Sequence, residues 1–171
     1  NYFRYELPKR SGGTRTVSAP DEVLKRVQRA ILKNLLIPLG QNDAAYGFVR
    51  GRSIAMNAEQ HVGREVVVNC DIQSCFPSVR WSLVLGTLRR DLGDRFSKAT
   101  ISLLVDICTA SGGLPIGAPT SPAILNRVLL KTDQVMSEAA QARDCNYTRY
   151  ADDLTFSGNG RAVELLGIAR R

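Results

Sequence analysis

Three aspartates in two short segments carry the side chains best suited to metal-dependent chemistry. Asp71 ends a β-branched run that begins at Glu65, and the pair Asp152-Asp153 lies between two short segments, CNYTRY (145–150) and LTFSG (154–158). Converging carboxylates repel one another strongly unless a cation lies between them. Mg²⁺ prefers such hard oxygen ligands and commonly binds a few carboxylates together with substrate phosphates. If these segments are neighbouring strands, the acids meet at one sheet edge, where two such ions would serve phosphoryl transfer.

A simpler interpretation of the same residues exists. Asp-Asp is a common turn dipeptide, and Asp71 could cap a turn or a helix. For an isolated Asp-Asp this interpretation is the better one, so the neighbouring sequence has to decide between the two.

The elements that must position these acids can be read from the pattern of apolar residues. The segment 65–71 is predicted to be a buried strand, and 145–150 and 154–158 are two strands joined by a tight turn at 151–153. A capped helix is expected from Thr120 or Ser121 to about Arg143. Further expected elements are a hairpin (2–7 and 14–18), helices (from Pro20 to Pro38, 53–61, 79–91 and 97–109) and a loop (111–119). This mixture, with its antiparallel hairpin, favours the α+β class.

Composition narrows the class of partner. The 171 residues include 23 Lys and Arg and 16 Asp and Glu, a net charge of 23 − 16 = +7, with 44% hydrophobic residues. Such a chain is globular, and its positive charge suits a polyanionic partner. The four cysteines form no zinc spacing, so reduced thiols in a cytoplasmic protein are expected. Its longest apolar runs are far too short for a membrane span, so no membrane partner is expected.

Three motifs in order resemble those of reverse transcriptases. Tyr150-Ala151-Asp152-Asp153 is similar to their YxDD box. Asp71, followed five positions later by Phe76, resembles their first aspartate motif. The segment 114–122, LPIGAPTSP, resembles their LPQGxxxSP motif, with Ile116 in place of the usual glutamine.

Other segments narrow the resemblance to retron-type bacterial reverse transcriptases. Asn57-Ala58-Glu59-Gln60-His61 matches the NAxxH motif associated with that group. The segments 8–15 and 46–54 look like fingers motifs of the same group, so the resemblance runs from near Asn1 to about Gly158.

The resemblance implies the fingers and palm of a right-hand polymerase, with an antiparallel ferredoxin-like palm sheet packed on helices. By this analogy the fingers take residues 1–62 and 78–118, the palm strand with the first aspartate takes 63–77, and the palm with its YADD hairpin takes 119–171. The chain continues 18 residues past Asp153. It is therefore expected to stop before the primer grip and to lack the thumb.

The resemblance also implies catalytic roles. Asp71 and Asp152 would be direct ligands of two Mg²⁺ ions, for which Mn²⁺ could substitute. Asp153 would support the site electrostatically or bind metal intermittently, and the main-chain carbonyl of Ile72 would complete a coordination shell. The reaction would join a deoxynucleotide to the 3′-hydroxyl of a primer.

Four residues are expected to bind the incoming nucleotide. Lys9 and Arg15 lie on a basic hairpin suited to gripping a triphosphate. Phe76 would pack under the sugar and exclude a 2′-hydroxyl, and Gly117 keeps the backbone character of its loop. Ile116 cannot make the hydrogen bond of the usual glutamine, which casts doubt on nucleotide affinity, fidelity or activity.

Four further residues are expected at the template. Arg50 and Arg52 would contact template phosphates. Asn57 and His61 lie at i, i+4 spacing on one helical face, where they are expected to be structural or to contact RNA.

The implied function is an RNA-directed DNA polymerase that copies an RNA template, a structured noncoding RNA, into DNA from a DNA primer and dNTPs. An effector protein and a role in bacterial anti-phage defence follow from the resemblance alone. Three alternatives remain: a palm-and-fingers module that binds RNA without synthesis, another bacterial reverse transcriptase (group II intron-like or defence-associated), and a nucleotide cyclase. The basic hairpin and Phe76 disfavour the cyclase.

Overall fold

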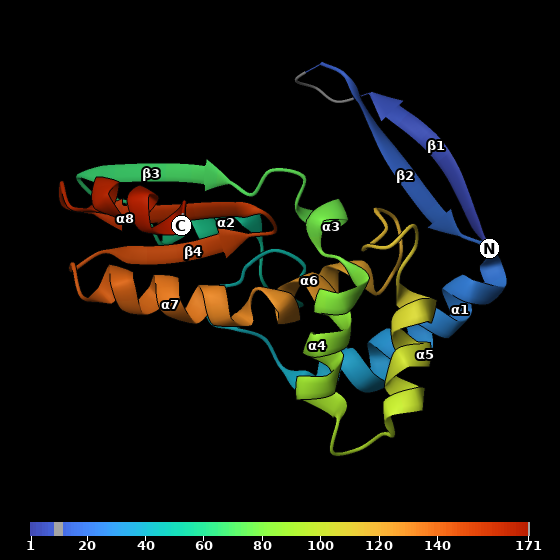
Figure 1. Cartoon of the computed structure of the whole chain (residues 1–171). Helices are drawn as coiled ribbons and strands as arrows, with labels where there is room; N and C mark the ends of the chain where they lie inside the picture. Colours follow the sequence, from blue (N-terminus) through green and yellow to red (C-terminus); the bar gives the residue numbers. More distant parts are fainter. Residues whose placement is uncertain (9–11, 171) are drawn as a thin grey trace. The chain divides into compact units, whose positions relative to one another are not determined.

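The computed structural model describes residues 1–8 and 12–170, which form an α+β structure with antiparallel sheets (Figure 1). The predicted fold class is therefore confirmed. The chain divides into two compact units, unit 1 (1–40 and 74–128) and unit 2 (41–73 and 129–171). The predicted fingers and palm segments have other bounds, with 41–62 grouped in unit 2 and 119–128 in unit 1. Their naming as fingers and palm stays a prediction.

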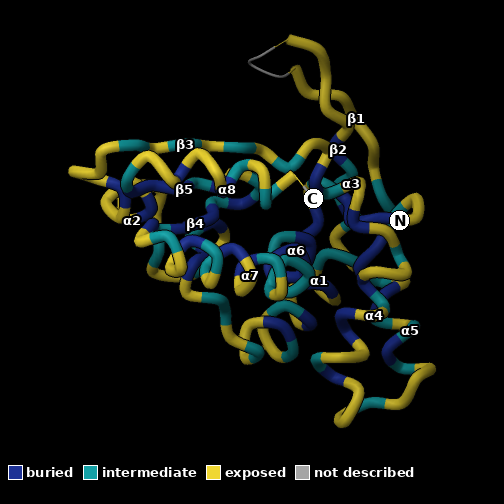
Figure 2. The backbone as a smooth tube through the Cα atoms, turned by 60° about the vertical axis from the view of Figure 1, so that its left-hand side comes forward, coloured by how far each residue is buried: buried dark blue, intermediate teal, exposed yellow. Residues whose placement is uncertain are grey.

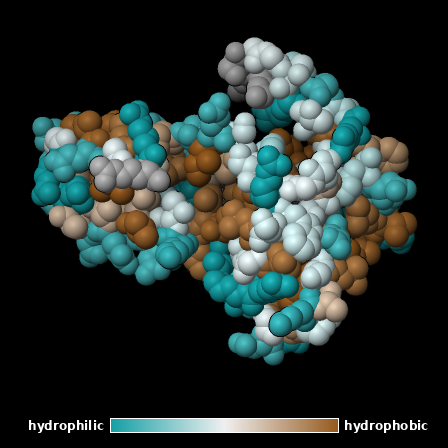
Figure 3. All heavy atoms as spheres, in the orientation of Figure 1, coloured by the Kyte–Doolittle hydropathy of each residue, from teal (hydrophilic) through white to brown (hydrophobic). Residues whose placement is uncertain are grey.

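Unit 1 begins with the predicted hairpin. Strands β1 (Tyr2–Pro8) and β2 (Thr14–Pro20) pair in antiparallel register, with Tyr2 opposite Pro20. Lys9, which was expected on this hairpin, lies outside the described residues. Figure 3 shows mainly hydrophilic and weakly polar residues on the visible side of this hairpin.

Helix α1 (Glu22–Ile31) follows, and Asp21 caps it by accepting a hydrogen bond of 2.8 Å from the Leu24 amide. The helical segment runs on through η1 (Leu32–Leu36) and η2 (Ile37–Leu39) before Gly40. Val23 and Val27, which recur at helical spacing in the sequence, are exposed, whereas Gln28 is fully buried. The Gln28 side-chain nitrogen donates to the Tyr2 hydroxyl and to the Ile107 carbonyl oxygen, so the donor end of this buried amide is satisfied.

The rest of unit 1 is helical. It contains α3 (Cys75–Ser78), α4 (Trp81–Leu92), α5 (Lys98–Cys108) and α6 (Ser121–Val128), with α4 packed beside α5 (Figure 1). The predicted helices 79–91 and 97–109 correspond to α4 and α5. Buried apolar side chains of these helices include Val84, Leu88, Leu92, Ile101, Val105, Ile124 and Leu125.

Unit 2 is built on a three-stranded antiparallel sheet. Strands β3 (Val66–Asp71), β5 (Asp153–Gly158) and β4 (Asn146–Tyr150) lie side by side in that order. Helix α7 (Leu130–Gln141) packs on β4, and α8 (Ala162–Ala169) packs on β3 and β5. The short helix α2 (Ile54–Glu59) also contacts β4. The core of this unit contains Met136, Ala140, Tyr147, Leu154, Phe156 and Leu165.

Two predictions about these elements were wrong. The expected helix from 121 to 143 is two helices, α6 and α7, interrupted at Leu129, where the chain passes from unit 1 to unit 2. The strand β3 is not buried on both faces: Val66, Val68 and Cys70 are half-buried, whereas Val67, Asn69 and Asp71 are exposed (Figure 2). The reason is that β3 is an edge strand with α8 against one face.

Within the described residues, no helix is both long and apolar enough to cross a membrane.

Candidate active site

The two acidic segments meet at one end of the sheet of unit 2. Asp71, the last residue of β3, is the register partner of Asp153, the first residue of β5. Direct partners on antiparallel strands project to the same face, with Cβ atoms about 5 Å apart. The Ile72 amide donates a hydrogen bond of 3.1 Å to the Asp152 carbonyl oxygen, which adds the turn residue to the group. The backbones of Asp71, Asp152 and Asp153 are thus brought to one sheet end, and a shared site formed by their carboxylates stays a prediction.

The electrostatics of this end reflect the shared negative charge. Burial raises the pKa of Asp153, and the neighbouring carboxylates of Asp152 and Asp71 raise that pKa further. Like charges favour the protonated form of a carboxyl group, and a bound cation would reverse that preference.

The donor set suits a hard divalent cation, because its side-chain ligands are all carboxylate oxygens. Among the described residues, however, no three Asp, Glu, His or Cys side chains are already grouped closely enough to hold a metal ion. Backbone pairing thus brings the aspartates to one sheet end without forming a coordination shell. The chemistry of these carboxylates suits a hard divalent cation.

The turn that carries Asp152 is a two-residue hairpin connection. Tyr150 pairs with Asp153, so Ala151 and Asp152 alone join β4 to β5. Ala151 has φ = 60°, the left-handed region that tight hairpin turns require at their first central position. The sequence prediction of a turn at 151–153 is thus confirmed, with Asp153 already in the strand.

Asp71 and Asp153 project to one face of the sheet. Helix α2 and the residues after it lie over the same face, at the end away from these aspartates. The His61 ring is buried, with Nδ1 2.6 Å from the Ser157 hydroxyl and Nε2 2.7 Å from the Thr148 hydroxyl. Burial lowers the pKa of His61, and the charge of Arg64 lowers that pKa further. Ser157 projects to the same face as Asp153 because the two are four positions apart on β5. His61 therefore fastens this segment to the face that bears the aspartates.

A pocket of about 290 Å³ lies between that segment and the sheet, with Asn57, His61, Val67, Asn69 and Thr155 in its lining. Asn57 is 7% exposed. Its buried Oδ1 makes no hydrogen bond within the described part of the chain. RNA contacts of Asn57 and His61 stay predictions.

The two arginines expected at the template differ in their surroundings. Arg50 is exposed. The Nη1 of Arg52 donates to the carbonyl oxygens of Asn42, Asp43 and Ala45 at 2.6–2.9 Å, so this guanidinium organises the 42–45 loop. A contact between either arginine and template phosphate stays a prediction.

The residues expected to bind nucleotide belong to unit 1. Arg15 is exposed on β2, Phe76 is half-buried in α3, and Lys9 lies outside the described residues. Gly117 has φ = 114°, and a Cβ there would lie 3.0 Å from a methyl group of Val17. The Ser18 amide donates to the Ile116 carbonyl at 2.8 Å, so this loop is docked on β2. Because the aspartates lie in unit 2, a single nucleotide site formed by both groups stays a prediction.

Sequence reasoning missed a buried ion pair behind the sheet. Arg149 and Asp133 are fully buried, and Nη2 of Arg149 lies 2.7 Å from Oδ2 of Asp133. The sequence could have indicated the burial of Arg149, because strand alternation puts it on the same face as Tyr147, toward the core. An arginine at such a position needs a buried partner.

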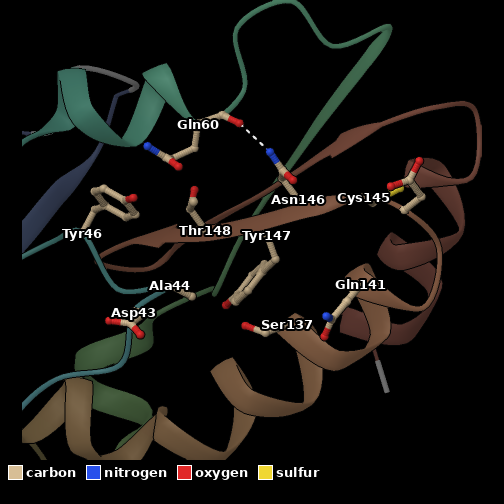
Figure 4. Close-up of a pocket in the computed structure, with 11 residues that line it drawn as sticks. Asp43, Ala44, Tyr46, Gln60, Ser137, Gln141, Cys145, Asn146, Tyr147 and Thr148 are labelled. Carbon is tan, nitrogen blue, oxygen red and sulfur yellow. Dashed lines mark hydrogen bonds between the residues drawn. The ribbon is translucent and has the colours of Figure 1, made fainter.

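Sequence reasoning also gave no indication of a pocket of about 530 Å³ along the outer edge of β4 (Figure 4). Ser137 and Gln141 of α7 line it, together with Asp43, Gln60 and Asn146, whose side-chain amide donates to the Gln60 carbonyl at 2.7 Å. None of the three aspartates lines this pocket.

Comparisons with known proteins agree with the motifs. The profile of the reverse transcriptase (RNA-dependent DNA polymerase) family matches residues 7–169. The retron Mx162 reverse transcriptase of Myxococcus xanthus is 41% identical over 92% of this chain and 36% of its own length. The retron Ec86 reverse transcriptase of Escherichia coli is 37% identical over 84% of this chain and 44% of its own length. The chain thus spans less than half the length of these two relatives.

Solved structures with the same fold include telomerases at low identity. Apo telomerase of Candida tropicalis, lacking its C-terminal domain, superposes with a TM-score of 0.65 at 13% identity, over 98% of this chain and 45% of the other. Telomerase of Candida albicans in complex with a fragment of telomeric RNA gives 0.63 at 12% identity, over 99% and 39% of the two chains. These likenesses concern the fold alone, whereas the family profile spans nearly all of the sequence: the chain belongs to the reverse transcriptase family.

Proposed function

We propose that this chain is the catalytic part of an RNA-directed DNA polymerase of retron type. The observation that carries the proposal is the pairing of Asp71 with Asp153 across β3 and β5, with Asp152 tied to Ile72 by a main-chain hydrogen bond. Two motifs whose paired aspartates are 82 positions apart (153 − 71 = 82) are thereby brought to one sheet end.

In the proposed reaction, Asp71 and Asp152 hold two Mg²⁺ ions, for which Mn²⁺ can substitute. The Ile72 carbonyl is a further ligand, and Asp153 adds negative charge beside them. When bound, Mg²⁺ would supply acidification of the primer 3′-hydroxyl and neutralisation of the charge on the leaving pyrophosphate. The protein contributes positioning and charge placement, which account for most of the rate in phosphoryl transfer.

The incoming dNTP is proposed to contact unit 1. Lys9 and Arg15 bind the triphosphate, since guanidinium and ammonium groups match phosphate oxygens. Phe76 packs against the deoxyribose, and Gly117 lets the backbone of its loop approach the nucleotide.

The template is proposed to be a structured noncoding RNA, and the product strand grows from a DNA primer. Arg50 and Arg52 contact phosphates, and Asn57 and His61 shape the adjacent surface. The named retron reverse transcriptases among the relatives support this choice. By the same analogy the enzyme works in the bacterial cytoplasm, in anti-phage defence with an effector protein.

Primer extension tests the proposal. The full-length natural polypeptide is incubated with an RNA template, a DNA primer, dNTPs and Mg²⁺. The wild type should extend the primer, and Asp152→Asn should abolish extension while RNA affinity changes less than about twofold, because a neutral amide replaces only a metal ligand. The matched control is Asp94→Asn, an exposed aspartate of unit 1, which should extend normally. A wild type that binds RNA without extending any primer contradicts the proposal.

A second candidate function is an RNA-binding module without synthesis. Ile116, in place of the usual glutamine, favours it, because isoleucine cannot hydrogen-bond to the nucleotide. Ile116→Gln separates the two candidates: an inactive wild type that gains extension with glutamine is an impaired polymerase. If both chains bind RNA and neither extends a primer, the binding module is correct.

A further inference from the structure

A buried arginine holds the turn that carries Asp152. Arg149, the residue before Tyr150, is fully buried in β4. Its Nε and Nη2 donate to the two carboxylate oxygens of Asp133, both at 2.7 Å, and its Nη1 donates to the Ala151 carbonyl oxygen at 2.6 Å. One planar group therefore joins helix α7 to the peptide that leads directly into Asp152.

Asp133 fixes the direction of this guanidinium. It is fully buried on α7, and its Oδ1 also accepts a hydrogen bond of 2.8 Å from the Tyr147 hydroxyl. A bidentate arginine–carboxylate pair defines the plane of both groups. Apolar residues of similar volume would often stabilise a core as well as a buried ion pair does, so stability alone does not account for this arrangement.

The turn needs such support because of its backbone. Ala151 adopts φ = 60°, a conformation that residues with a side chain rarely take without surrounding contacts. The hydrogen bond from Arg149 orients the peptide between Ala151 and Asp152. On the other side of Asp152, its own carbonyl accepts from the Ile72 amide. Both peptides next to the Asp152 side chain are thus held by hydrogen bonds.

The segment 44–47 supports the same turn from outside the strand. The Arg149 amide donates to the Ala44 carbonyl, and the Tyr46 amide donates to the Arg149 carbonyl, both at 2.7 Å. Gly47 then approaches the turn so closely that a Cβ on it would lie 2.2 Å from the Ala151 nitrogen. A side chain at position 47 would therefore displace Ala151.

We propose that Arg149 is a positioning residue for the Asp152 carboxylate, acting through the Ala151 carbonyl, and that Gly47 is glycine so that the turn can keep this position. The proposal rests on the proposed polymerase function for its kinetic consequence. Its structural consequence, the presentation of Asp152 to a divalent cation, does not depend on that function.

The primary test measures Mn²⁺ binding by electron paramagnetic resonance, with the full-length polypeptide and without nucleic acid. Arg149→Lys keeps the positive charge beside Asp133 but cannot supply three donors in one plane. We expect Mn²⁺ affinity to fall by about 10-fold in Arg149→Lys and in Gly47→Ala, because loss of a group that orients a metal ligand typically lowers metal affinity by about 10- to 100-fold. The control, Arg143→Lys, alters a half-exposed pair with Glu164 in the same unit and should bind Mn²⁺ like the wild type.

A double-mutant cycle separates positioning from general damage. If Arg149 acts through Asp152, Arg149→Lys should weaken Mn²⁺ binding in the wild type but not in an Asp152→Asn background. In primer extension, Arg149→Lys should lower kcat while the KM for dNTP stays within about twofold. Circular dichroism establishes that each variant is folded, and Gly47→Ala supplies the comparison if Arg149→Lys is not.

Wild-type Mn²⁺ affinity in folded Arg149→Lys, or an equal loss in the Asp152→Asn background, overturns the proposal. If the double-mutant cycle gives the expected Mn²⁺ affinities but the wild type extends no primer, the positioning role is supported and the polymerase function is contradicted. The two failures are therefore distinguishable.

Discussion

The main-chain amide of Ile72 donates a hydrogen bond of 3.1 Å to the main-chain oxygen of Asp152. This bond lies just beyond the last register pair of β3 and β5, Asp71 and Asp153. It continues the pairing of the two segments into the turn, so residues from both acidic motifs are fixed to one another by backbone.

The charge at this end predicts how Asp153 affects stability. Its pKa is raised by burial and by Asp152 and Asp71, so the folded state binds this proton more tightly than the unfolded state. Between the ordinary aspartate pKa of about 3.9 and the raised value, stability falls as pH rises, and the loss is complete above the folded pKa. Without divalent ions, Asp153→Asn should therefore melt at a higher temperature than the wild type at pH 7.

Thermal melts from pH 4 to 8 check this prediction. The difference in melting temperature between Asp153→Asn and the wild type should shrink as pH falls toward 4. Millimolar Mg²⁺ should also reduce this difference at pH 7, because it stabilises the wild type. Asp94→Asn, at an exposed position of unit 1, serves as the control. An Asp153→Asn variant that melts below the wild type at pH 7 would show that the carboxylates do not repel one another.

His61 predicts the opposite pH dependence. Its pKa is lowered by burial and by Arg64, so the unfolded state binds the proton more tightly. Stability is then fully present above the ordinary histidine pKa of about 6.5 and is lost as pH falls toward the folded pKa. His61→Phe leaves the buried hydroxyls of Ser157 and Thr148 without this partner, which should cost about 2 kcal/mol at pH 8.

Urea unfolding at pH 8 and pH 5.5 measures the cost of His61→Phe and how that cost depends on pH. The difference in the free energy of unfolding between the wild type and His61→Phe should narrow at pH 5.5. Arg64→Gln removes the nearby positive charge, so it should reduce the acid loss of the wild type. A gap that widens on acidification would contradict a neutral His61 ring in the folded chain.

A further prediction concerns the effect of Phe76 on the preference for dNTP over rNTP. If its ring packs against the deoxyribose, Phe76→Ala opens space for a 2′-hydroxyl. The preference for dNTP over rNTP, measured as the ratio of kcat/KM values, should fall by about 10-fold or more. Phe96→Ala removes another half-buried ring of unit 1 and should leave the ratio unchanged. Unaltered selectivity in an active Phe76→Ala variant would remove Phe76 from the nucleotide site.

Local sequence patterns predicted the elements of the active end well. The β-branched run before Asp71 and the two short segments on either side of Asp152-Asp153 indicated strands. The tight turn indicated that the two later strands pair in antiparallel fashion, as β4 and β5 do. Whether the 65–71 strand lies beside them was left open by the sequence, and the structure has Asp71 opposite Asp153. Such features depend on residues close in sequence, where turn chemistry and alternation act.

What the sequence did not indicate depends on contacts between distant elements. The partner of Arg149 is 16 residues away on a helix, and Gly47 meets Ala151 from a separate loop. Ala151 takes a left-handed conformation without being glycine, which local propensity disfavours. The break at Leu129 likewise lies inside a continuous helical pattern, at the passage between the two units.

The Asp133–Arg149 pair carries the largest expected effect on stability. Asp133→Ala leaves a buried guanidinium without its carboxylate, and breaking a buried pair in this way costs about 3–5 kcal/mol. Glu164→Ala breaks a partly exposed pair with Arg143 in the same unit and should cost about 0–1 kcal/mol. Urea unfolding of both variants measures the contrast, and losses that differ by less than about 1 kcal/mol would contradict it.

Replacing both partners, Asp133→Leu with Arg149→Met, should recover much of the stability because no charge remains buried. The same double variant should remain slow in primer extension, since methionine donates no hydrogen bond to the Ala151 carbonyl.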